Sequence, residues 1–163
     1  MKKVRVIGTG SDFGEDRLGW QAIEVLQQSG LAQSCPAADI GFHFCARPGN
    51  ELLDLLRGAD QVILIDAMRS EAEPGTIRRF AADDFDALPA PLSSHILGLR
   101  EALQIAAALG ELPPHSIVFG IEMARGNQRF DYRAAPQARV DWLQLARQIE
   151  REINNPVLIG EEQ

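Results

Sequence analysis

The sequence holds few of the residues that would tie it to nucleic acids or to an oxidising compartment. Its 16 lysines and arginines are outnumbered by 23 acidic residues, for a formal net charge of -7. A nucleic-acid-binding protein needs a basic surface to neutralise phosphates, so this balance argues against such a partner. Only two cysteines occur, Cys35 and Cys45, without the close pairing of zinc or redox motifs. We expect both to be reduced and structural.

Long hydrophobic runs are also missing. Two lysines near the N-terminus precede only a short apolar stretch, which is shorter than the apolar part of a secretory signal. No run approaches the roughly 20 apolar residues that a membrane-spanning helix requires. We therefore expect a cytoplasmic protein without a membrane partner.

The sequence does contain strand-like and helix-like segments in alternation. Apolar periodicity predicts strands near residues 4–7, 40–44, 62–65, 76–80 and 116–122, and helices near 16–29, 52–56, 93–109 and 136–153. Val62–Ile65 is apolar at every position, which is typical of a strand covered on both faces. This order predicts a single α/β domain over residues 1–163, with a mostly parallel sheet flanked by helices on both faces. The last ten or so residues are expected to be frayed.

Three potential metal ligands come at the ends of predicted strands. Asp16 lies between the first strand and the first helix, and Asp66 directly follows Val62–Ile65. His95 opens the helix that comes after a proline-rich loop. Open α/β sheets bind ligands at the carboxyl ends of their strands, and two carboxylates with an imidazole can hold a divalent transition metal. The sequence therefore predicts a metal site at Asp16, Asp66 and His95.

Each of these residues also has a structural interpretation. Asp16 can stabilise the positive end of a helix, Asp66 can accept bonds from loop amides, and a histidine in a first helical turn is most often structural. Other motifs fit less well. Gly8, Gly10 and Gly14 lack the spacing of a dinucleotide-binding turn, and the sequence has neither a GxSxG motif nor a phosphate-binding-loop lysine.

Four segments resemble, in order and spacing, the signature of hydrogenase maturation proteases. The resemblance covers roughly residues 3 to 123, and the run that contains His95 is its most specific part. Glu15, Arg17 and Met123 depart from the family pattern, as does the sequence beyond Gly126. The four segments are Val6-Ile7-Gly8-Thr9-Gly10 with Gly14-Glu15-Asp16-Arg17-Leu18-Gly19, Ile65-Asp66-Ala67 with Pro74-Gly75-Thr76, Ser93-Ser94-His95-Ile96-Leu97-Gly98-Leu99, and Phe119-Gly120-Ile121-Glu122.

The resemblance implies an endopeptidase that removes the C-terminal extension of a hydrogenase large-subunit precursor. In such an enzyme nickel is carried by the precursor and recognised by the protease, and the metal-contacting and catalytic residues carry over onto Asp16, Asp66 and His95. Two alternatives stay open. One is a maturation factor that grips a metal-loaded peptide without cutting it. The other is a small-molecule hydrolase, for which Arg17, Arg69 and Arg78 give only scattered support.

Overall fold

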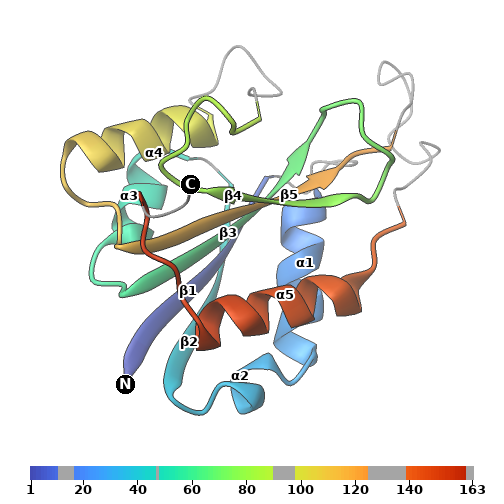
Figure 1. Cartoon of the computed structure of the whole chain (residues 1–163), viewed down its shortest axis with the longest axis horizontal. Helices are drawn as coiled ribbons and strands as arrows, with labels where there is room; N and C mark the ends of the chain where they lie inside the picture. Colours follow the sequence, from blue (N-terminus) through green and yellow to red (C-terminus); the bar gives the residue numbers. More distant parts are fainter. Residues whose placement is uncertain (11–16, 47, 90–97, 125–138, 161–163) are drawn as a thin grey trace.

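A five-stranded sheet forms the middle layer of the structure, a computed structural model that describes residues 1–10, 17–46, 48–89, 98–124 and 139–160 (Figure 1). The strands are β1 (Lys2–Thr9), β2 (Ala38–Cys45), β3 (Gln61–Met68), β4 (Ile77–Ala81) and β5 (His115–Glu122). Their order in the sheet is β2-β1-β3-β5-β4. All neighbours are parallel except β4, which runs antiparallel to β5 at one edge. The predicted fold class is confirmed, and the strand predicted near residues 76–80 is this edge strand.

Helices cover both faces of this sheet. They are α1 (Leu18–Gln28), α2 (Leu31–Ser34), α3 (Asn50–Leu56), α4 (Leu99–Ala108) and α5 (Trp142–Asn154). One core packs α1, α2 and α5 against the sheet, and a second core packs α3 and α4 against the opposite face (Figure 1). The inner strands supply both cores by alternation, which is why β3 is apolar on both sides. Ile63 and Ile65 lie in the first core, and Val62 and Leu64 lie in the second.

The end of β3 differs from the prediction. Asp66 does not follow the strand but lies within it, because pairing with β5 continues from Asp66 opposite Gly120 to Met68 opposite Glu122. The strand therefore ends at Met68, three residues later than the apolar run indicates.

The start of α4 was also predicted too early. Gly98 is extended, with φ -76° and ψ 172°, and the helix begins at Leu99. Glycine is a poor helix former, so it suits this boundary. The predicted cap residues Ser93 and Ser94 lie outside the described residues.

The inner face of α5 agrees with the apolar periodicity of residues 136–153 except at one position. Val140, Ala146 and Ile149 pack against the first core, and the helix also buries Leu145 and Ile153. Leu143 has the same periodicity but is 60% exposed. Near the C-terminus, the amide of Ile159 donates to the carbonyl of Pro114 (2.9 Å). No described helix is long and apolar enough to cross a membrane.

Both cysteines are buried and neither forms a disulfide, as predicted. Burial is the main reason why the pKa of the Cys35 thiol is raised above its ordinary value. A raised pKa lowers the thiolate fraction at neutral pH and with it the reactivity of the thiol.

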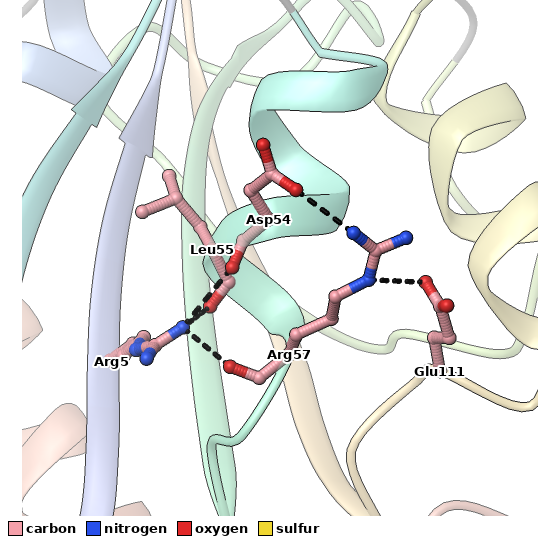
Figure 2. Close-up of polar contacts among 5 residues, drawn as sticks. All are labelled: Arg5, Asp54, Leu55, Arg57 and Glu111. Carbon is pink, nitrogen blue, oxygen red and sulfur yellow. Dashed lines mark hydrogen bonds and ion pairs between the residues drawn. The ribbon is translucent and has the colours of Figure 1, made fainter.

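Arg5 fixes α3 to the sheet (Figure 2). Its Nη1 donates to the carbonyls of Leu55, of Asp54 (3.4 Å) and of Arg57 (2.8 Å), at the end of the helix where carbonyls lack helical partners. The Arg57 side chain in turn meets Asp54 (3.0 Å) and Glu111 (3.2 Å). Because α3 ends shortly before β3 begins, these contacts lie at the end of β3 opposite to Asp66.

Candidate functional site

The carboxyl ends of β1 and β3 are the point at which the chain connections diverge. From β1 the chain continues to β2 on one side, whereas β5 and β4 lie on the other side of β3. In open α/β sheets ligands bind at such a switch point, outside the carboxyl ends of the strands. Asp66 lies near this end of β3, so its position agrees with a role in binding or chemistry.

Two glycines bring α1 directly onto these strand ends. A Cβ on Gly19 would lie 2.2 Å from the carbonyl oxygen of Thr9 and 2.7 Å from that of Ile65, and a Cβ on Gly8 would lie 2.2 Å from the carbonyl oxygen of Gly19. The Thr9 hydroxyl also donates to the Ile65 carbonyl (3.3 Å). The positive end of α1 therefore lies against the peptide that precedes Asp66, where it favours negative charge.

Asp66 is half-buried, next to apolar side chains of the second core. It shares a sheet face with Leu64 and Met68, which both belong to that core. Its neighbour on β5 is Gly120, where a Cβ would lie 2.7 Å from the sulfur of Met68 and 3.2 Å from the Phe80 ring. Apolar side chains of Met68 and Phe80 therefore fill the strand position beside Asp66.

A second carboxylate organises the loop of residues 69–76, which joins β3 to β4. Glu122, the last residue of β5, is only 3% exposed. Its carboxylate accepts the Ser70 amide (2.9 and 3.1 Å) and the Ser70 hydroxyl (2.8 Å). The Gly75 amide donates to the Glu122 carbonyl (2.9 Å), and the Glu122 amide donates to the Thr76 carbonyl (2.9 Å). One residue therefore holds both ends of the loop.

Sequence reasoning gave neither Gly19 nor Glu122 a role. Both residues end segments that resemble the family pattern, and Glu122 is also a charged residue placed directly after the apolar run Ile117–Ile121. The resemblance does not explain why glycine is needed at residue 19, because that need arises from the close approach of backbone from β1 and β3.

Of the three predicted metal ligands, the structure places Asp66. Asp16 and His95 lie outside the described residues. They precede α1 and α4, whose first residues are Leu18 and Leu99. Among the residues that the structure does describe, no three His, Cys, Asp or Glu side chains form a group that could hold a metal ion.

Comparison with known proteins identifies the family. A family model described as hydrogenase maturation protease matches residues 48–150, which include Asp66 and His95. The chain belongs to this family. The curated protein HupD of Thiocapsa roseopersicina, a hydrogenase expression/formation protein, is 28% identical over 123 residues, which are 74% of this chain and 54% of HupD. The chain thus spans about half the length of that relative.

Solved structures share the fold. An endopeptidase from Escherichia coli is 18% identical and superposes with a TM-score of 0.63, covering 98% of this chain and 97% of its own. The NiFe hydrogenase maturation protease HycI from Thermococcus kodakarensis is 18% identical with a TM-score of 0.61, covering 94% of each chain. At this identity the likeness shows a common fold.

Proposed function

We propose that this protein is a cytoplasmic endopeptidase that removes the C-terminal extension of a nickel-loaded hydrogenase large-subunit precursor. Membership of the hydrogenase maturation protease family supports this function. The observation that carries it is the position of Asp66, a half-buried carboxylate at the carboxyl edge where β1 and β3 diverge, within the segment that matches the family.

In the proposed reaction, nickel belongs to the substrate and marks the precursor as ready for cleavage. Asp16, Asp66 and His95 would contact that metal, since carboxylate and imidazole groups suit divalent transition metals. Amide hydrolysis needs an activated water and stabilisation of the developing oxyanion. The metal can polarise the scissile carbonyl, and a carboxylate can take a proton from the water. The positive end of α1 would favour the negative charge that develops at this edge.

The substrate test compares nickel-loaded and nickel-free precursor by mass spectrometry. We expect the purified protein to shorten the loaded form and leave the nickel-free form intact. Equal cleavage of both forms would refute recognition of nickel. Binding of the loaded precursor without cleavage would favour the non-catalytic maturation factor instead.

The residue test uses Asp66→Asn and His95→Ala. Because each variant removes a proposed contact to the substrate metal, cleavage should fall by about 100-fold or more. The melting temperature should change little, because substitutions outside the core usually cost within about 0.5 kcal/mol. Asp39→Asn, at an exposed position near the opposite end of β2, is the matched control and should cleave normally. Normal cleavage by Asp66→Asn or His95→Ala, or unfolding of His95→Ala, would show that the residue does not have the proposed role.

A further inference from the structure

We propose that Glu122 is a positioning residue, which holds the 69–76 loop in a fixed conformation beside Asp66. The loop then forms a wall of the site, and the precursor chain is placed against this wall. This inference rests on the proposed function for the identity of the substrate. Its structural half, the fixing of the loop by Glu122, can be tested without any substrate.

The first argument is the free-energy cost of burying the Glu122 carboxylate. A charged group that is 3% exposed is expensive to bury unless hydrogen bonds compensate for the lost water. Here the compensation comes from Ser70, whose amide and hydroxyl both donate to the carboxylate. Hydrogen bonds to an ionised acceptor are stronger than neutral ones, so this contact fixes Ser70 firmly.

The second argument is the place of the contact relative to Asp66. Ser70 comes four residues after Asp66, and Glu122 lies in register with Met68, which shares a sheet face with Asp66. The carboxylate therefore reaches from β5 to the chain that leaves the strand of Asp66. The Glu122 backbone also bonds Gly75 and Thr76, so the side chain holds the start of the loop and the backbone holds its end.

The third argument is the conformation of the loop itself. Glu71 has φ 66°, a left-handed value that a non-glycine residue keeps only when its surroundings impose it. Gly75 has φ 86°, and a Cβ there would lie 2.0 Å from the carbonyl oxygen of Arg139. The loop is thus held at Ser70, at Gly75–Thr76 and against residue 139, while Ser70, Glu71 and Glu73 are exposed.

Proteolysis tests the structural half. Trypsin cuts after arginine, and Arg69 is exposed, so the Arg69–Ser70 peptide bond is a potential cleavage site. The N–H of this peptide bond is the Ser70 amide that donates to the Glu122 carboxylate. We expect Glu122→Ala to be cut there at least about tenfold faster than wild type, because local opening no longer has to break charge-assisted bonds. Glu122→Gln, which keeps one acceptor oxygen, should fall between the two. Equal rates for the three proteins would overturn the inference.

Kinetics on nickel-loaded precursor test the functional half. Glu122→Ala should raise KM by about tenfold with a smaller change in kcat, since a wall contributes to placement of the chain and Asp66 is untouched. Ser70→Ala should shift KM in the same direction. In the double variant it should add little to the effect of Glu122→Ala, because both substitutions remove the same hydrogen bond between the Ser70 hydroxyl and the Glu122 carboxylate. Leu31→Ala, which weakens the first core at α2, near the start of β2 and away from the carboxyl edge, controls for stability and should leave KM unchanged.

The outcomes separate the two proposals. If wild type cleaves the precursor and Glu122→Ala does so with unchanged KM, the inference is wrong and the proposed function stands. If wild type cleaves nothing, the proposed function fails, and with it the assignment of the wall to the precursor. Should Glu122→Ala not fold, Glu122→Gln and Ser70→Ala provide the same comparison.

Discussion

Gly8 and Gly19 let α1 rest directly on the ends of β1 and β3. At Gly19 the atoms in the way of a Cβ are backbone oxygens of Thr9 and Ile65, which cannot move without disturbing the sheet. We therefore expect Gly19→Ala to lower the free energy of unfolding by about 1–3 kcal/mol, the usual range for overpacking, as measured by urea denaturation.

Gly41→Ala is the matched control for this variant. A Cβ on Gly41 would lie 2.8 Å from His43 Nε2, at the end of a side chain that can turn away. This substitution should therefore cost less than Gly19→Ala. If the two variants lose equal stability, close backbone approach at Gly19 is not the reason for its glycine.

Single residues were predictable where their chemistry shows in the local sequence. Asp66 stood out because an acidic residue after four apolar ones is conspicuous. The role of Glu122 was not predictable, since its partner Ser70 lies 52 residues away in sequence. Contacts of this kind depend on which strands become neighbours, and periodicity does not report that order.

At the level of elements, the cap of α5 offers a direct test. The helix begins after Asp141, whose side chain accepts the Gln144 amide (3.0 Å) and so satisfies one of the free N–H groups of the first turn. Asp141→Ala should lower the free energy of unfolding by about 1 kcal/mol, measured in urea. Asp141→Asn keeps an acceptor oxygen and should stay near wild type. A loss of equal size in both variants would point to the charge rather than to the cap.

Strands were easier to predict than the ends and faces of helices. Alternation and apolar runs gave all five strands, because each strand packs against at least one core. The face of α5 was predicted in part, because Val140, Ala146 and Ile149 pack against the first core. Leu143 was wrongly included, since Leu145 is the buried residue in this turn and Leu143 is 60% exposed. The boundary of α4 was missed because two serines are a typical N-terminal signal, yet the extended backbone is at Gly98.

For the whole molecule, the alternation of strands and helices was enough to predict the layers. The arrangement has an energetic consequence that the elements alone do not show. Each inner strand buries one set of side chains in the first core and the other set in the second, so neither core can be lost while the sheet stays intact. We therefore expect one cooperative unfolding transition, as is usual for single domains of this size.

Both tryptophans lie on the side of the first core, and this permits a test of coupling between the cores. Trp20 is on α1, where it packs edge-to-face on Phe44, and Trp142 opens α5. Leu103 is fully buried on α4 in the second core, so Leu103→Ala should cost about 2–5 kcal/mol. We expect tryptophan fluorescence and far-UV circular dichroism to report the same lowered midpoint in urea. Leu109→Ala, 59% exposed and just after the same helix, should change it by no more than about 0.5 kcal/mol. A circular dichroism midpoint that falls in Leu103→Ala while the fluorescence midpoint stays in place would mean that the two cores unfold separately.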